Sequence, residues 1–260
     1  MKRKLNQLLL AILIAFAFGC SKDDSIQSKL TLEGKQVSQV FEDGQLTTRY
    51  TYKPNGLLDT VHFYSKFFAS GLFATSEYNS DNLIASQEYY RNTSEGPIPT
   101  GSITFSYSNG MVVEYSSINE KNTFKYENGK CVEWSRYQDD ILEEKKSFIY
   151  DQNGNIKEEL KTDYDNGKLF VKIKIEYEYD SNHSPESYIY QLTPGFPTSQ
   201  NNITLRNQTV IDSAPGTSFF VADSKYEYEY DLDGYPIKSI KSYMADGDWI
   251  QDTVTEYTYF

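Results

Sequence analysis

The feature that most constrains the fold of this chain is a short segment that recurs along its whole length. An aromatic residue, one intervening residue, a tyrosine and a few polar residues lead to a glycine in Tyr50–Gly56, Phe105–Gly110, Phe124–Gly129, Phe148–Gly154 and Tyr228–Gly234, with weaker copies at Tyr78–Asn82 and Tyr177–His183. Aromatic residues two apart lie on one face of a β-strand. The Asn-Gly or Asp-Gly pair supplies the positive φ angles that tight hairpin turns need. Each copy therefore predicts a strand that ends in a turn.

The spacing of the turn glycines indicates how these strands are connected. Glycines recur 12 or 13 residues apart in the pairs Gly44 and Gly56, Gly154 and Gly167, and Gly234 and Gly247. That spacing fits one strand of about nine residues plus a turn, which is typical of an up-and-down antiparallel meander. Val171–Tyr179 alternates apolar and charged residues, as a half-buried strand does. We predict an all-β chain of roughly 14–17 strands.

A meander of this length is expected to curl or close, because the open edges of a sheet invite pairing with other chains. The predicted architecture is a large barrel or a strongly curved half-barrel. Two proline-containing segments interrupt the rhythm, at residues 93–101 and 193–224, and the second holds a candidate strand at 203–211. Long loops on a regular scaffold are common places for function.

The first twenty residues have the pattern of an export signal. A basic start at residues 2–4 is followed by about a dozen apolar residues, and small residues then lead into Cys20. This pattern resembles the lipobox of bacterial lipoproteins, in which the cysteine is diacylated and the signal is cut just before it. The alternative is an ordinary secretory signal with an incidental cysteine. We predict a signal peptide at 1–19, a lipidated tether at 20–28 and a single β-meander domain at 29–260.

The residues after Cys20 give the expected location. The stretch Ser21, Lys22, Asp23 and Asp24 resembles the lysine-plus-acidic export signal of Bacteroidota surface lipoproteins. The resemblance implies that the lipid on Cys20 holds the protein in the outer membrane, facing the cell exterior. The alternative is that these residues form a plain solvated tether.

The sequence of this chain resembles two protein families. Phe148–Ile156 and Tyr228–Ile237 are similar to the tyrosine–aspartate (YD) repeats of the Rhs family, in which Tyr-Asp-x-x-Gly precedes an apolar strand. The chain lacks the Gly-Arg-Leu ending and the processing domain of that family, so a toxin-encapsulating role is not implied. The whole arrangement over about residues 25–260 more closely resembles Bacteroides-type lipoproteins of a domain family of unknown function with a porin-like fold. That resemblance implies a barrel-like meander and no known activity.

The charge and the last residues of the chain restrict the partners. The net charge is −12, and about −15 once the three basic residues at 2–4 are removed. Such a surface repels phosphate backbones, so no nucleic-acid partner is expected. A terminal Phe260 is typical of barrels that insert into the outer membrane, but Thr258 and Glu256 break the apolar alternation of such a signal. We therefore expect no insertion of the barrel itself.

The sequence indicates no catalytic residue, no metal site and no cofactor. The histidines His62 and His183 lie apart among polar or aromatic residues, and no Cys/His cluster has zinc-ligand spacing. Cys131 is interpreted as a small buried hydrophobe. Carboxylate pairs such as Asp139-Asp140 and Glu143-Glu144 are interpreted as solvated turn residues, although a glycosidase also uses two carboxyl groups. The chain is not expected to be an enzyme.

The remaining signal is aromatic, because the chain holds 23 tyrosines and 15 phenylalanines. Aromatic faces stack on the C–H faces of sugar rings, while hydroxyls and carboxylates bind sugar hydroxyls. The candidate ligand-binding residues in and near the second proline-containing segment are Tyr188, Tyr190, Phe196, Phe219 and Phe220; the alternative is that such rings fill the interior. The predicted function is a non-enzymatic binding module for a glycan or an envelope protein, with polysaccharide preferred. The alternatives are a structural envelope protein that bridges other proteins and a glycan-acting enzyme.

Overall fold

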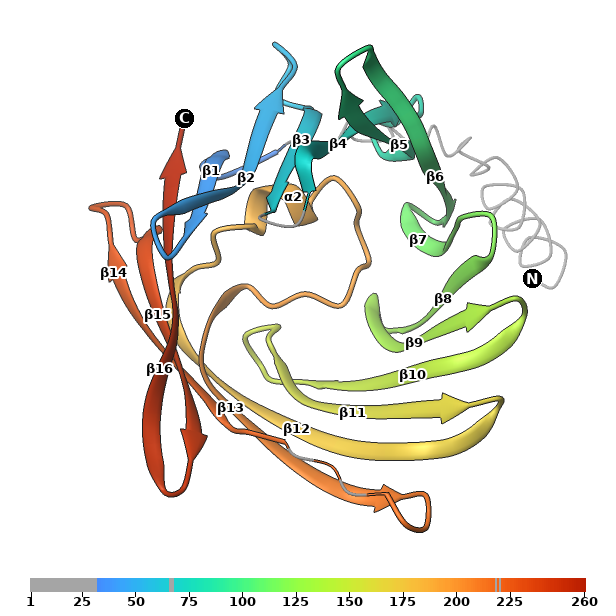
Figure 1. The fold of residues 1–260 in the computed structure, drawn as a ribbon, viewed down its shortest axis with the longest axis vertical. Coiled ribbons are helices and arrows are strands. Elements are labelled where there is room, and N and C mark those ends of the chain that lie inside the picture. Colours follow the sequence, from blue (N-terminus) through green and yellow to red (C-terminus); the bar gives the residue numbers. More distant parts are fainter. Residues whose placement is uncertain (1–31, 66–67, 218, 220) are drawn as a thin grey trace, which may run out of the picture. The chain divides into compact units, whose positions relative to one another are not determined.

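The chain forms a closed barrel of antiparallel strands (Figure 1). The computed structural model describes residues 32–65, 68–217, 219 and 221–260. The predicted signal, the tether with Cys20, Ser21, Lys22, Asp23 and Asp24, and Phe220 lie outside the described residues. The described strands are β1 (Val37–Glu42), β2 (Gln45–Tyr52), β3 (Leu58–Ser65), β4 (Phe68–Tyr78), β5 (Ile84–Thr93), β6 (Gly96–Ser108), β7 (Met111–Ser116), β8 (Glu120–Glu127), β9 (Lys130–Gln138), β10 (Ile141–Tyr150), β11 (Ile156–Asp165), β12 (Lys168–His183), β13 (Asn201–Ser213), β14 (Ser224–Tyr230), β15 (Pro236–Ala245) and β16 (Asp248–Tyr259), and the helix is α2 (Ser187–Tyr190).

Consecutive strands pair as an up-and-down meander, and the first and last strands close it. β1 pairs with β2 on one side and with β16 on the other, where Val37 lies opposite Tyr259. Each described strand therefore pairs with a neighbour on both sides over at least part of its length, which leaves few free edges at which other chains could add. The predicted all-β meander is confirmed, its sixteen described strands fall within the predicted range, and the sheet is a full barrel.

Local turn chemistry explains why an aspartate follows the repeated tyrosine. In the turn between β10 and β11, the carboxylate of Asp151 accepts hydrogen bonds from the backbone N–H groups of Asn153 (2.8 Å) and Asn155 (2.9 Å). Gly154 in the same turn has a φ of 90°, a backbone angle that residues with a Cβ rarely adopt. Asp231 organises the turn between β14 and β15 in the same way. The repeated segment is therefore a strand end plus a side-chain-stabilised turn.

The segment at 93–101, expected to interrupt the meander, instead continues it as the hairpin between β5 and β6. Pro97 and Pro99 lie in β6, opposite Asn92 and Tyr90. β7 pairs only with Thr104–Ser108 of β6, so the first half of β6 is an edge on that side. Proline has no backbone N–H and is tolerated at such an edge. The strand predicted at 203–211 is confirmed as part of β13.

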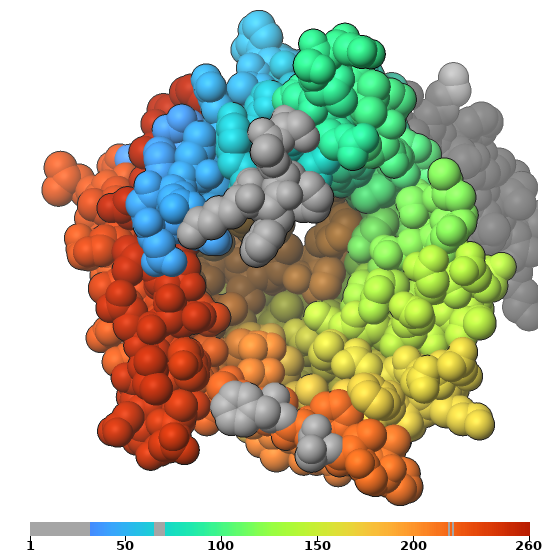
Figure 2. Space-filling model, in the orientation of Figure 1, coloured from blue at the N-terminus to red at the C-terminus, as the bar shows by residue number. Residues whose placement is uncertain are grey.

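The connection between β12 and β13 distinguishes the two ends of the barrel. Residues 184–200, here called the plug, include α2 and run inside the ring of strands (Figure 1). The plug lies at the end where even-numbered strands turn into odd-numbered ones. Seen from the opposite end, the molecule is hollowed at its centre (Figure 2). We call that opposite end the open end.

Candidate functional site

The plug is fixed by hydrogen bonds to separate parts of the barrel. The Tyr188 hydroxyl donates to the backbone oxygen of Gly56, before β3, at 2.8 Å. The backbone oxygen of Pro194 accepts from the N–H of Val112 in β7 at 2.9 Å. Leu192 between them is fully buried. The plug is therefore held to the wall on more than one side.

A repeated hydrogen bond runs around the plug end of the barrel. In every even-numbered strand of the described chain, a tyrosine hydroxyl near the strand's end donates to a backbone oxygen near the start of the preceding strand. These eight residues, here called the latch tyrosines, are Tyr52, Tyr78, Tyr107, Tyr126, Tyr150, Tyr179, Tyr228 and Tyr259. The hydroxyl of Tyr126 also donates to the plug, at Gly195 (3.0 Å). The repeated tyrosine thus ties each hairpin together.

Packing of the plug identifies the inner face of each strand. The ring of Phe196 in the plug lies 5.0 Å, centroid to centroid, from that of Phe124 in β8. Phe124 is paired directly with Trp134, Trp134 with Lys146, and Lys146 with Lys161. Directly paired residues share one face of a sheet. All of these side chains therefore face the lumen.

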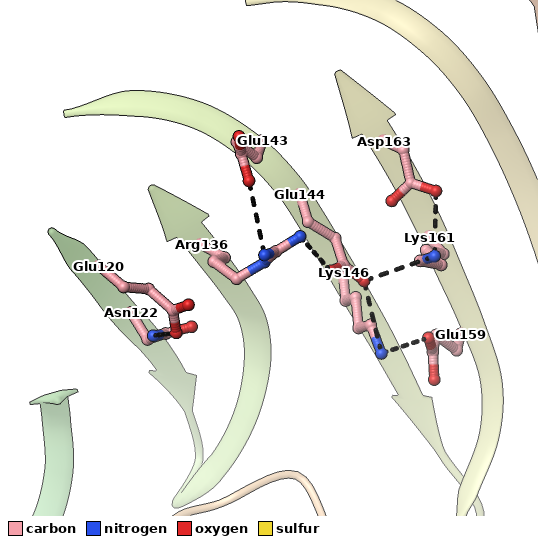
Figure 3. A network of polar contacts seen from close by, with 9 residues as sticks. All are labelled: Glu120, Asn122, Arg136, Glu143, Glu144, Lys146, Glu159, Lys161 and Asp163. Carbon is pink, nitrogen blue, oxygen red and sulfur yellow. Dashed lines mark hydrogen bonds and ion pairs between the residues drawn. The ribbon is translucent and has the colours of Figure 1, made fainter. Parts of the chain in front are cut away.

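The inner face of β9 to β11 carries a connected set of charges (Figure 3). The carboxylate of Glu144, whose side chain is 12% exposed, lies 3.3 Å from the guanidinium of Arg136. It also lies 3.8 Å from the amine of Lys146 and 3.7 Å from that of Lys161. Lys161 is further paired with Asp163 at 3.0 Å. Several cations around one carboxylate offset the cost of removing these charges from water.

The charged set extends to aromatic side chains deeper in the lumen. The amine of Lys146 lies 3.2 Å from the carboxylate of Glu159 and 5.3 Å from the ring centroid of Trp134. The Tyr177 hydroxyl donates to Glu159 at 2.9 Å. Burial, and then the charge of Glu159, raise the pKa of Tyr177, so its hydroxyl stays protonated. Polar contacts therefore run without a break from β9 to β12.

Glu186 of the plug lies near a tyrosine of the plug and a tyrosine of the barrel wall. The Tyr190 hydroxyl donates to the Glu186 carboxylate. Burial and the negative charge of Glu186 raise the pKa of Tyr190 and of Tyr50 in β2. Protonated hydroxyls and aromatic rings therefore surround the lumen beside the plug as well.

The outer face of the same strands is also charged. Glu133 pairs with Lys125 and with Lys145, both at 2.6 Å. Lys125 follows the inward-facing Phe124, so it faces outward. Lys225 also faces outward, because it lies between Ser224 and Tyr226 and the latter lines the lumen. Its amine lies 5.8 Å from the ring of Trp249, which places that tryptophan on the outer wall.

The plug borders a cavity on each side. A cavity of about 340 Å³ lies between the plug and the inner faces of β11 to β14. A second cavity, of about 410 Å³, lies between the plug, the segment before β1 and the turn between β14 and β15. Tyr190, Thr198 and Ser199 line both. The two cavities therefore adjoin at these three residues.

The candidate ligand-binding residues fall in different surroundings. Tyr188 is buried and Phe196 packs in a core cluster, so both anchor the plug. Tyr190 lines both cavities. Phe219 packs against Phe170 in β12, with ring centroids 5.1 Å apart, away from the plug. Phe220 lies outside the described residues.

The histidines and Cys131 are placed within the wall. His62 in β3 lies against Phe73, and burial and Arg49 lower its pKa. His183 stacks on Tyr235 at 4.7 Å. Cys131 is buried, and burial raises the pKa of its thiol to about 11. In the part of the chain that the structure describes, no group of three or more His, Cys, Asp or Glu residues could hold a metal ion.

Sequence reasoning missed the luminal charges of Arg136, Lys146 and Lys161. The interpretation of Glu143-Glu144 as solvated turn residues is wrong, because both lie in β10 and the side chain of Glu144 is only 12% exposed. The signal available was a run of charges in a strand context, such as residues 143–146. That run does not tell which side chains face inward. In residues 32–260, gaps at 66–67, 218 and 220 aside, no helix is long and apolar enough to cross a membrane.

Comparison with known proteins identifies the fold. No family model matches the chain, and no curated protein matches it in sequence. Its structure is similar to a porin-like protein from Bacteroides uniformis, with a TM-score of 0.56 and 13% identity over 88% of this chain and 99% of that one. A porin-like protein from Bacteroides vulgatus matches with a TM-score of 0.48 and 14% identity, over 87% of this chain and 99% of that one. The chain has the porin-like fold that its sequence pattern led us to expect.

Proposed function

We propose that this protein is a lipid-anchored barrel on the outside of the outer membrane that binds polysaccharide in its lumen. The observation that carries the proposal is the inner wall, where the ring of Trp134 and the charged groups around Glu144 face one lumen. Aromatic faces stack on sugar rings, and carboxylates, amines and guanidinium groups bond to sugar hydroxyls. The lumen is hollowed at the open end (Figure 2), where a chain could enter.

The charged outer wall supports an anchored barrel over an inserted one. A barrel that spans a membrane carries an outward apolar band about 25 Å tall. Here the outer face bears ion pairs on several strands, for example Glu133 with Lys125, and Lys238 with Glu229. Desolvating such groups in lipid is unfavourable. Anchoring would then fall to the predicted lipid on Cys20.

The anchor is tested by labelling cells with a fatty-acid analogue. The full chain is expected to incorporate the label, and Cys20→Ser is expected to abolish it, because the acyl chains are attached through the Cys20 thiol and amine. Cys131→Ser is the matched control, since it removes the other cysteine of the chain and should leave labelling unchanged. Label retained in Cys20→Ser would contradict a lipoprotein.

Polysaccharide binding is tested with the purified full chain on a glycan and envelope-polysaccharide array. We expect specific binding that weakens at least about tenfold in Trp134→Ala, because removing a central aromatic anchor typically costs about 2 kcal/mol or more of binding free energy. Trp249→Ala is the control, because it removes the other tryptophan, which lies on the outer wall. Equal weakening in both variants, or a blank array, would contradict luminal binding. A blank array would favour the structural, bridging role.

A further inference from the structure

Arg206 in β13 faces the lumen and is partly exposed there. It is paired directly with the luminal Tyr177 in β12. On its other side it is paired with Ser224 in β14, two residues before the luminal Tyr226. Directly paired residues, and residues two apart in one strand, share a face of the sheet. The positive charge of Arg206 lowers the pKa of Tyr177 against the larger effect of burial, so the guanidinium lies near that hydroxyl.

Arg91 in β5 is a second luminal arginine, nearer the open end. Direct pairs run from the luminal Tyr50 in β2, across β3 and β4, to Tyr89 in β5. Tyr89 therefore faces the lumen, and so does Arg91, two residues later. Odd-numbered strands end at the open end, and Arg91 is exposed near the end of β5. The two arginines therefore lie at different depths in one lumen.

Neither arginine has a carboxylate partner among the described residues, unlike the other luminal cations. Arg136 is the one arginine of the described chain that forms ion pairs. The luminal cations that are paired with carboxylates are Arg136, Lys146, Lys161 and Lys241. Most of the positive charge of the inner wall is therefore neutralised in place, whereas Arg91 and Arg206 have no negative partner in the described chain.

The guanidinium of Arg206 has hydrogen-bond donors to spare. It carries five N–H donors in a planar fork that matches the two oxygens of a carboxylate or sulfate group. Among the described residues only the Tyr177 hydroxyl interacts with it. Hydrogen bonds between two charged groups are roughly twice as strong as those between neutral groups. An anionic group is therefore a better ligand for Arg206 than a sugar hydroxyl.

The overall negative charge of the chain does not prevent such a contact. The net charge of −12 repels an anionic polymer at a distance. At physiological ionic strength, however, interactions between exposed charges are largely screened beyond about 8 Å. A polymer that enters at the open end responds to the charges it touches, which include Arg91 first and Arg206 deeper in the lumen.

From these contacts we infer that the lumen binds an acidic polysaccharide, with a carboxylate or sulfate group of one sugar residue held by the guanidinium of Arg206. Arg91 binds a second anionic group of the same polymer nearer the open end. This inference rests on the proposed luminal binding and specifies the charge class of the polysaccharide.

The test is calorimetric titration of the full chain, at an ionic strength of about 0.15 M, with two matched pairs of ligands. One pair is oligogalacturonate and its uncharged methyl ester, and the other is dextran sulfate and dextran. In at least one pair the anionic member is expected to bind at least about tenfold more tightly than the neutral member. The first pair reports on a carboxylate and the second on a sulfate.

Arg206→Gln should remove the preference for the anionic member and leave the weaker binding of the neutral member unchanged. The substitution strands no carboxylate in the described chain, because Arg206 has no ion pair to break, so the fold should be retained. Arg206→Lys should restore part of the preference, since lysine keeps the charge but not the planar fork. Arg91→Gln should cause a smaller loss than Arg206→Gln, because exposed charges are more strongly screened.

Arg49→Gln is the matched control. Arg49 directly precedes the luminal Tyr50 in β2, so it faces outward, and it too forms no ion pair with a described residue. This variant should bind all four ligands as the natural chain does. The inference is overturned if neither pair shows a preference, if Arg206→Gln keeps the preference, or if Arg49→Gln loses it to the same extent. Trp134-dependent binding on the array would then leave the proposed function standing, whereas a blank array removes both.

Discussion

Above about pH 10 the barrel should unfold as one unit within about two pH units, because its latch tyrosines must stay protonated. Burial raises the pKa of all eight, for Tyr179 to about 12. The folded chain then holds protons that the unfolded chain releases above pH 10. The corresponding stability is complete below pH 10 and is lost as the pH rises toward the folded-state pKa values. Each tyrosine lowers the unfolding free energy by at most about 1.4 kcal/mol per pH unit, against a typical total of about 5–15 kcal/mol.

The measurement follows tyrosinate absorbance and far-ultraviolet circular dichroism as the pH is raised, and both signals are expected to change together. Tyr150→Phe is the control. At neutral pH it should be about 1–2 kcal/mol less stable, because the Cys131 carbonyl loses its donor. Its stability should also fall less steeply above pH 10. Gradual ionisation of the tyrosines with the sheet signal intact would show that the latches do not hold the fold together.

Substituting Gly195 by alanine should loosen the plug. Gly195 has a φ of 100°, and a Cβ there would lie 2.6 Å from the Tyr126 hydroxyl and 3.1 Å from the Cβ of Met111. The left-handed backbone costs about 1–2 kcal/mol with alanine, and the overpacking about 1–3 kcal/mol more. The clash also falls on the hydroxyl that links a latch tyrosine to the plug. We expect a total loss of about 2–5 kcal/mol.

Gly247→Ala separates the clash from the backbone strain. Gly247 has a φ of 91°, and a Cβ there would meet nothing within 4 Å. Alanine at this position should therefore lower the free energy of unfolding through backbone strain alone, without overpacking. Urea unfolding of both variants should show the larger loss in Gly195→Ala. Hydrogen exchange of the Val112 amide, which donates to Pro194 in the plug, should accelerate in that variant alone. Equal losses in the two variants would contradict a tightly fitted plug.

The hairpins could be predicted from the sequence because their determinants are a few residues apart. Even the weak copy without glycine follows the rule, since Asn82 has a φ of 63°, and asparagine tolerates that conformation. Closure could not be predicted. It depends on the pairing of Val37 with Tyr259, two residues near opposite ends of the described chain. The local sequence of β1 or of β16 does not show whether the strand has a partner on its second edge.

The site was less predictable, because β-bulges decide which side chains face inward. A register shift lies between Leu142 and Glu144 where β10 pairs with β9. A shift of one residue exchanges inner and outer positions, so neighbours such as Lys145 and Lys146 cannot be assigned from sequence. The sequence pattern favours the plug aromatics as ligand contacts, but a segment inside a barrel must also satisfy its own backbone and packing. Tyr188 and Phe196 serve that need.

Because of the latch tyrosines, a single hairpin can be duplicated in a gene without loss of its own stabilising hydrogen bond. Donor and acceptor of each latch lie in the same hairpin, so a tandem duplication of one hairpin carries both and needs no matching change elsewhere in the ring. Barrel diameter grows with strand number. The width of the lumen in such chains can therefore change in discrete steps, one copied hairpin at a time, while the closing contact between first and last strands stays the same.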